Sequence, residues 1–106
     1  MIVSTLNPPY YAVIFSTILT ENNSGYLEMA EKMEELAKQQ NGFLGIESAR
    51  KEIGITVSYW KDEASIIAWK NNMYHQQAQK LGKEKWYRWY KVRICKVEKE
   101  YEHFLP

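Results

Sequence analysis

The run Tyr10-Tyr-Ala-Val-Ile-Phe-Ser-Thr-Ile-Leu-Thr20 constrains the architecture more than any other stretch of this 106-residue chain. It is rich in β-branched and aromatic residues, which favour a strand. Alternate residues of a strand point to opposite faces, and here both faces are largely apolar. We therefore expect a central strand with something packed on each of its faces. One face would carry Tyr11, Val13, Phe15, Thr17 and Leu19, and the other Ala12, Ile14, Ser16 and Ile18.

An amphipathic helix is expected after this strand. Residues 26–37 place apolar side chains three or four positions apart, with charged residues outside that stripe. The polar side chains of residues 21–25 suit a helix N-cap. Asn41-Gly42 marks the end of the helix, because a glycine readily adopts the left-handed conformation that terminates one.

Two short strands and a second helix follow. Residues 43–50 and 53–60 read as strands joined by Lys51-Glu52. Asp62 is a good N-cap for the second helix, and we expect that helix to fray near residues 71–72. Its inward face would carry Ala64, Ile67, Ala68 and Asn71, with Ile66 and Trp69 at the flanks.

The last part of the chain predicts a turn and a final strand. The turn runs through His75 to Leu81 and is stopped by Gly82, and the strand covers residues 87–97. Along that strand Tyr90, Val92 and Ile94 would share one face, opposite Trp89, Lys91, Arg93, Cys95 and Val97.

The resulting order, strand-helix-strand-strand-helix-strand, is the βαββαβ pattern of ferredoxin-like α+β domains. It builds an antiparallel sheet with both helices on one face. The other face also carries apolar side chains, and burying it against a second copy predicts a homodimer, that is, a dimeric α/β-barrel assembly. We expect an N-terminal arm at residues 1–9, bounded by Pro8-Pro9, and a single domain at residues 10–106.

Composition excludes several classes of function. The formal charge of +1 does not suit nucleic acid or an anionic membrane as a partner. The lone cysteine, Cys95, cannot form an intrachain disulfide, and no signal peptide or membrane span is recognisable, so we expect a cytoplasmic protein. His75 and His103, the two histidines, lie too far apart in the pattern to suggest a metal site.

Aromatic residues are the unusual feature, with 4 Trp and 8 Tyr. Such side chains collect in ligand pockets and at interfaces, although any single one of them more often fills the core. The segment 85–96 interleaves aromatic and basic residues as single-strand binders do. The third strand, 53–60, lacks the basic-Gly-aromatic-Gly-Phe-Val pattern of RNA-recognition modules, so RNA binding is the weaker interpretation.

Three stretches carry a resemblance to a known family: Asn41-Gly-Phe-Leu-Gly-Ile-Glu-Ser48, Ile55-Thr-Val-Ser-Tyr-Trp-Lys-Asp-Glu-Ala-Ser-Ile-Ile-Ala-Trp69 and His75-Gln-Gln-Ala78. Together they resemble the antibiotic-biosynthesis monooxygenase (ABM) family. The strand segment 86–93 is similar to the uncharacterised YqjZ-like branch of that family. The resemblance implies ferredoxin-like homodimers whose sheets pack face to face. Some members oxygenate polycyclic aromatic compounds with dioxygen and without metal or flavin, and others cleave haem.

The resemblance also implies which positions matter. Trp60 matches the Trp that ends the third strand of the cofactor-free oxygenases, but Thr56 stands where they have Asn and Ile66 where they have Tyr. Haem-degrading members have an Asn near Phe15 or Ser16, and a His where this chain has Gln79.

Two hypotheses follow. The first is a monooxygenase without a cofactor, acting with dioxygen on a small aromatic or phenolic substrate. His75 would be its base, because an imidazole titrates near neutral pH. The second is a non-catalytic dimeric module that binds a small ligand. Substrate binding is assigned to Trp60, Trp69, Trp86, Tyr90 and Arg93.

Overall fold

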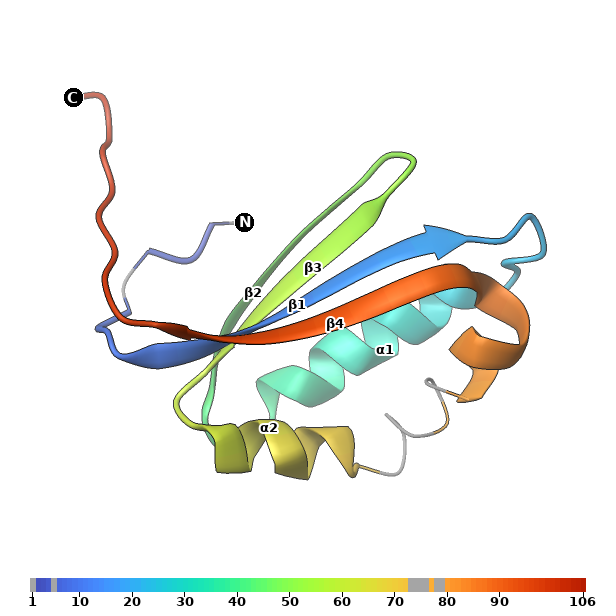
Figure 1. Ribbon diagram of the computed structural model, residues 1–106, viewed down its shortest axis with the longest axis horizontal. Helices are drawn as coiled ribbons and strands as arrows, with labels where there is room; N and C mark the ends of the chain where they lie inside the picture. Colours follow the sequence, from blue (N-terminus) through green and yellow to red (C-terminus); the bar gives the residue numbers. More distant parts are fainter. Residues whose placement is uncertain (1, 5, 73–76, 78–79) are drawn as a thin grey trace.

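The structure is a computed structural model that describes residues 2–4, 6–72, 77 and 80–106. Its helices and strands follow the order expected from the sequence (Figure 1). They are β1 (Tyr10–Leu19), α1 (Tyr26–Lys38), β2 (Phe43–Arg50), β3 (Gly54–Trp60), α2 (Glu63–Lys70), a π-helical turn η1 (Gly82–Trp86) and β4 (Tyr87–Val97). In the described part of the chain, no helix is long and apolar enough to cross a membrane.

The four strands form one antiparallel sheet in the order β2-β3-β1-β4, and both helices lie on the same face (Figure 1). This is the ferredoxin-like α+β arrangement, so the fold predicted from the sequence is confirmed. β1 lies between β3 and β4, which also confirms its central position. β2 and β4 form the two edges.

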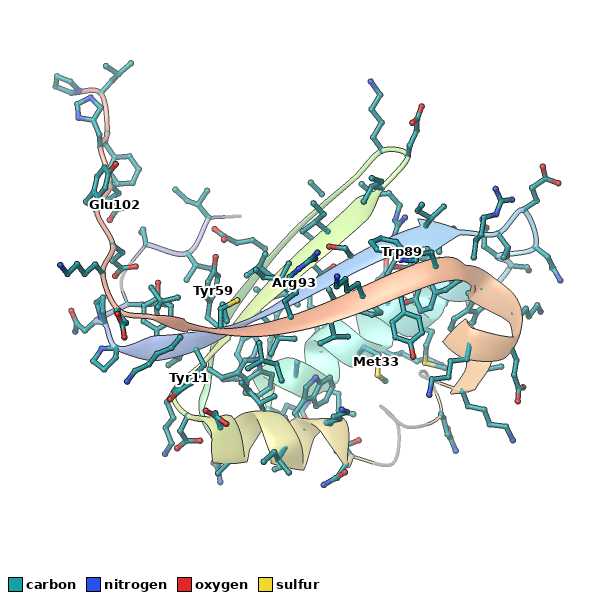
Figure 2. The ribbon with its side chains drawn as sticks, viewed as in Figure 1. Tyr11, Met33, Tyr59, Trp89, Arg93 and Glu102 are labelled. Carbon is teal, nitrogen blue, oxygen red and sulfur yellow. The ribbon has the colours of Figure 1, made fainter. Side chains whose placement is uncertain are left out.

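Strand register divides the side chains between a helix side and an open face. Directly paired residues of antiparallel strands share a face. Val13 pairs with Ser58 and Ile94, which places the three on the helix side. Ile14 pairs with Val57 and Arg93 on the open face. Figure 2 shows the same division, with Tyr11 and Met33 on the helix side and Tyr59, Trp89 and Arg93 on the other.

The core lies between the sheet and the ends of the two helices. Trp60, Ile66 and Ala37 are buried there, and partly buried Tyr11, Val13, Phe43 and Trp69 surround them. The inward face predicted for α2 is therefore wrong: Ile67 is 58% exposed, whereas Ser65 and Ile66 are buried. Ile66 and Trp69 lie three residues apart on one face of the helix and pack against Trp60 of the sheet. A helix of only eight residues has one such inward face.

The ends of the helices agree with the sequence in part. Asp62 caps α2 as predicted, and its side chain accepts a 2.8 Å hydrogen bond from the Ser65 N–H. The N-cap of α1 is instead Gly25, whose φ of 86° a glycine adopts without strain, and no side chain caps the helix. Gly82 was expected to stop a turn but begins η1, which leads directly into β4.

Both chain termini lie on the side of the open face (Figure 1). The arm before β1 packs Val3 against Gly45, where a Cβ would come within 2.8 Å of the Val3 side chain. The Val3 N–H donates a 2.9 Å hydrogen bond to Glu47. The tail after β4 is held at its base by Tyr10, whose hydroxyl donates to Glu100 at 2.5 Å.

Candidate functional site

Aromatic side chains on the helix side gather at two ends of the sheet. We call one group the Trp60 cluster, formed by Phe43, Trp60 and Trp69. The other, the Arg50 cluster, contains Phe15, Thr17, Tyr26, Arg50, Trp86, Tyr87 and Tyr90. Strand β3 begins at Gly54, which pairs with Arg50, and ends at Trp60. About 20 Å of strand therefore separates the two groups.

The three side chains of the Trp60 cluster are aromatic and carry no charge. Trp60 is completely buried, and its ring stacks on Trp69 with centroids 6.1 Å apart and planes at 26°. Phe43 meets Trp60 edge-on at 5.5 Å. The indole N–H of Trp60 donates a 2.9 Å hydrogen bond to Ser58 Oγ, so its polar group is satisfied.

The Arg50 cluster draws its aromatic residues from four elements. Trp86 of η1 is buried against Tyr26 of α1 at 5.8 Å, and its indole N–H donates to the Ser24 carbonyl at 3.1 Å. Tyr87 of β4 meets Tyr26 at 5.8 Å and Phe15 of β1 at 5.5 Å. Tyr90 completes the group 5.9 Å from Phe15 and is 39% exposed, so the cluster reaches the surface.

A cation and four hydroxyl groups distinguish the Arg50 cluster. The guanidinium of Arg50 donates to Thr17 Oγ1 and, at 3.3 Å, to the Tyr26 hydroxyl. Its carbon lies 5.4 Å from the centre of the Tyr26 ring, within cation–π range. Burial raises the pKa of the Tyr87 phenol, and the neighbouring Tyr26 raises it further. The phenol of Tyr87 is therefore a neutral group at physiological pH.

An exposed apolar strip extends from the Arg50 cluster along β4. Tyr90, Val92 and Ile94 all point to the helix side, and they are 39%, 48% and 52% exposed. Their partners on β1 are Thr17, Phe15 and Val13, respectively. Large apolar side chains on the inner side of a sheet are normally covered, so this strip can accept an apolar ligand.

The structure separates the residues assigned to substrate binding. Trp60 and Trp69 lie together in the Trp60 cluster, and Trp86 and Tyr90 lie in the Arg50 cluster. Arg93 points to the open face, away from all four (Figure 2). His75, the base predicted from the sequence, lies outside the described residues, as does Gln79. Among the described residues, no three His, Cys, Asp or Glu side chains come together.

Arg50, Thr17 and Tyr26 were not foreseen as site residues. Arg50 follows the alternation of the second strand and falls on its inward side, opposite a glycine. A basic residue at an inward position facing Gly54 was the signal that could have revealed it. Tyr26 was assigned only to the apolar stripe of its helix.

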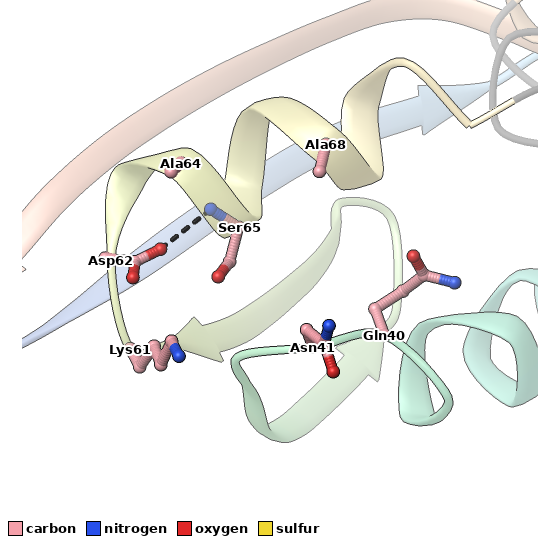
Figure 3. A pocket seen from close by; sticks show the side chains of 7 residues that line it. All are labelled: Gln40, Asn41, Lys61, Asp62, Ala64, Ser65 and Ala68. Atoms are coloured by element: carbon pink, nitrogen blue, oxygen red, sulfur yellow. Dashed lines mark hydrogen bonds between the residues drawn. The ribbon is translucent and has the colours of Figure 1, made fainter.

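A polar hollow of about 330 Å³ lies where the end of α1 meets the start of α2 (Figure 3). Hydrogen bonds from Ser65 hold the pKa of the Asp62 carboxyl below its usual value. The lining contains amide, charged and small side chains and no aromatic ring, so it does not match an aromatic ligand. Its residues are Gln40, Asn41, Lys61, Asp62, Ala64, Ser65 and Ala68.

A pair of tyrosines on the open face joins the two terminal segments. Tyr10 and Tyr59 meet edge-on at 5.7 Å, and the Tyr59 hydroxyl donates to Glu47 at 2.6 Å. Burial and the hydrogen bond to Glu100 raise the pKa of Tyr10 to about 12. Hydrogen bonds from Tyr59 and the Val3 N–H lower the pKa of Glu47. These groups fix the arm and the base of the tail to the sheet.

Comparison with known proteins shows the family of this chain and agrees with its fold. Residues 9–81 match the family described as antibiotic biosynthesis monooxygenase. The uncharacterized protein YqjZ of Bacillus subtilis (strain 168) is 49% identical over 98 residues, covering 91% of this chain and 86% of that protein. The fold is shared with Rv0793 from Mycobacterium tuberculosis, at a TM-score of 0.78, 10% identity and coverage of 88% and 99% of the two chains. It is also shared with SnoaB, a cofactor-independent oxygenase from Streptomyces nogalater, at a TM-score of 0.74, 6% identity and coverage of 88% and 97%.

Proposed function

Because this chain belongs to the antibiotic biosynthesis monooxygenase family, we propose that it oxygenates a small aromatic or phenolic compound without a cofactor. The observation that carries the proposal is the exposed strip of Tyr90, Val92 and Ile94 beside two aromatic clusters. An aromatic ligand on this strip would bury apolar surface, which stabilises the complex by a free energy of about 25 cal/mol per Å² buried. The cofactor-independent oxygenase SnoaB, which shares the fold, supports the reaction type.

The proposed chemistry needs little from the protein beyond binding and a base. Removing a proton from a phenol gives an electron-rich anion that passes an electron to dioxygen. One oxygen atom then enters the ring as a carbonyl and the other leaves as water, so the substrate supplies all four electrons that reduce dioxygen. His75 remains our proposed base, since an imidazole side chain can accept a proton near neutral pH.

The clusters divide the binding roles. Trp86 and Tyr90, together with the strip, would form the wall against the substrate ring. Trp60 and Trp69 would support the far end of the strip, where Ile94 pairs with Val13 of the core. Ile66, at the position where related oxygenases have Tyr, is buried in the core here and offers no hydroxyl group. The substrate must therefore be oriented by other polar groups.

Oxygen uptake tests the proposal. We expect the protein to consume dioxygen with one or more members of a panel of phenols and hydroquinones, and to leave them unchanged under anaerobic conditions. His75→Ala should abolish uptake, whereas His103→Ala, which alters the exposed histidine of the tail, should not. Uptake that is unchanged in His75→Ala would remove the role given to that residue. Binding without uptake across the panel would leave a non-catalytic ligand-binding module.

We also propose that the protein works as a homodimer joined through the open face. That face exposes Ile55 and Trp89 by 44% and 41%, and the tail beside it exposes Tyr101 and Leu105 by 100% and 86%. The chain has 7916 Å² of accessible surface, whereas a compact monomer of its 12.6 kDa has about 6,200 Å². A second copy would cover this excess.

Sedimentation at micromolar concentration tests the dimer. We expect a species of twice the chain mass of 12.6 kDa. Trp89→Glu, which introduces a charge on the open face, should shift the protein toward the monomer. A monomer in the unaltered protein would contradict the proposal. We place this dimer in the cytoplasm, where a lone thiol such as Cys95 stays reduced.

A further inference from the structure

We propose that the Arg50 cluster binds the carboxylate of a small aromatic acid, so that the ligand of the helix side carries one negative charge. This inference rests on the proposed function and names the class of its ligand. It starts from a cation that lacks an anionic partner. Within the described residues the ion pairs are those of Lys38 with Glu34 and Glu35, so Arg50 has no carboxylate partner there.

The backbone holds the Arg50 guanidinium in a fixed position. Arg50 pairs with Gly54 on β3, and Gly54 pairs with Thr17 on β1, so the three residues form a row across the sheet. A Cβ at residue 54 would collide with the guanidinium, which therefore lies directly over the bare backbone. The side chain reaches across β3 to the buried Thr17 hydroxyl. The position of the charge is set before any ligand arrives.

The neighbours of Arg50 leave donors for a ligand. Thr17 and Tyr26 supply neutral oxygen atoms, and the Tyr26 ring lies under the guanidinium. A guanidinium has five N–H donors, and the two hydrogen bonds formed here leave others free. Arg50 is itself exposed, so a carboxylate can approach it from solvent. Two parallel N–H···O bonds to a carboxylate are the preferred geometry of this group.

The aromatic residues beside Arg50 suit the body of such an acid. Tyr26 contacts both Arg50 and Tyr87, and the rings of Phe15, Tyr87 and Tyr90 lie 5.5 to 5.9 Å from one another. Tyr90 then leads onto the exposed strip of Val92 and Ile94. An acid whose carboxylate meets Arg50 can extend its ring along this series. One guanidinium balances one negative charge, which favours a monocarboxylate over a phosphate ester.

Titration of the full-length protein with benzoate and with benzamide tests this. The two probes have similar shape, and only benzoate is charged. We expect benzoate to bind at least tenfold more tightly by calorimetry and to shift the Arg50 side-chain Nε–H resonance in NMR spectra. Equal affinity for the two probes in the unaltered protein would overturn the proposal without any variant.

Variants locate the effect at one residue. Arg50→Gln should reduce benzoate affinity to that of benzamide, and Arg50→Lys should retain part of the preference because the charge stays and the bidentate geometry is lost. Arg88→Gln, which removes an exposed arginine of β4, should leave the preference intact. Circular dichroism verifies that each variant is folded. A benzoate preference that persists in folded Arg50→Gln would also overturn the proposal.

The outcome is separable from that of the oxygenase proposal. Benzoate preference without oxygen uptake on any phenol would leave the acid site standing and remove the oxygenase. Oxygen uptake on neutral phenols with no benzoate preference would do the reverse.

Discussion

The Trp60 cluster and the Arg50 cluster contain similar aromatic side chains in different surroundings. Trp60 has no exposed surface, and the Ser58 hydroxyl satisfies its indole N–H. The Arg50 cluster combines a cation, hydroxyl groups and a Tyr90 ring that reaches solvent. Aromatic content alone therefore does not identify a binding site. The charge and the exposure of the surrounding groups distinguish a site from a core.

The largest expected difference between the clusters is in stability. Trp60→Ala removes the centre of the core and should lower the free energy of unfolding by about 3–5 kcal/mol, as large-to-small core substitutions do. Urea denaturation measures it. Ile67→Ala on the exposed side of α2 is the control, with a change of about 0.5 kcal/mol or less. A cost below about 1 kcal/mol for Trp60→Ala would remove the distinction between core and site.

Alkaline pH should act on the Arg50 cluster and not on the Trp60 cluster, which has no ionisable group. Burial raises the pKa of Tyr87 in the folded state, so the folded chain holds this proton more tightly than the unfolded chain. The resulting stability is present below the unfolded tyrosine pKa of about 10 and is lost as pH rises beyond it.

Tyr87→Phe should remove this loss. One proton contributes a slope of up to about 1.4 kcal/mol per pH unit to the free energy of unfolding. Urea denaturation at a series of pH values from about 8 to about 11 measures the slope for both proteins. Tyr101→Phe, at a fully exposed position, should keep the slope of the unaltered protein. Identical slopes for all three would show that Tyr87 titrates as in the unfolded chain.

A methyl group at residue 54 should affect ligand binding more than stability. In Gly54→Ala the new Cβ occupies the place of the Arg50 guanidinium, which must leave Thr17. The lost hydrogen bond should lower the free energy of unfolding by about 1 kcal/mol, because the arginine can turn to solvent. The preference for benzoate over benzamide should disappear. A retained preference would show that the row across the sheet does not position Arg50.

The fold could be predicted from the sequence because strand alternation and helix periodicity are local. The apolar run of β1 indicated a central strand, and the bounds of β2 and β4 matched the prediction. Asp62 was foreseen as a cap because its side chain acts within its own turn. The inward face of α2 was misassigned, since which stripe packs inward depends on Trp60 in a neighbouring strand.

The candidate site could be predicted only in part, since its members meet through tertiary packing. Trp60 and Trp69, which lie in consecutive elements, were assigned to one site and do meet, but their separation from Trp86 and Tyr90 was not predicted. The position of the Arg50 guanidinium depends on a contact with Thr17, 33 positions away in the sequence, and on the absence of a side chain at Gly54. Arg93 was assigned to the same site as Tyr90, although strand alternation places the two side chains on opposite faces of the sheet, where the structure also has them.

The smallest expected effect on stability falls on the strip that joins the clusters. Val92 is 48% exposed, so Val92→Thr should change the free energy of unfolding by no more than about 0.5 kcal/mol. Val13→Thr, on the neighbouring strand, places a hydroxyl against the core and should cost about 1–3 kcal/mol. If the strip is a ligand surface, Val92→Thr should nevertheless weaken benzamide and benzoate binding by a similar factor, because it alters the apolar contact and leaves Arg50 in place. Urea denaturation and calorimetry measure the two quantities. Unchanged binding of both probes would confine the ligand to the Arg50 cluster, and a large loss of stability would show that Val92 belongs to the core.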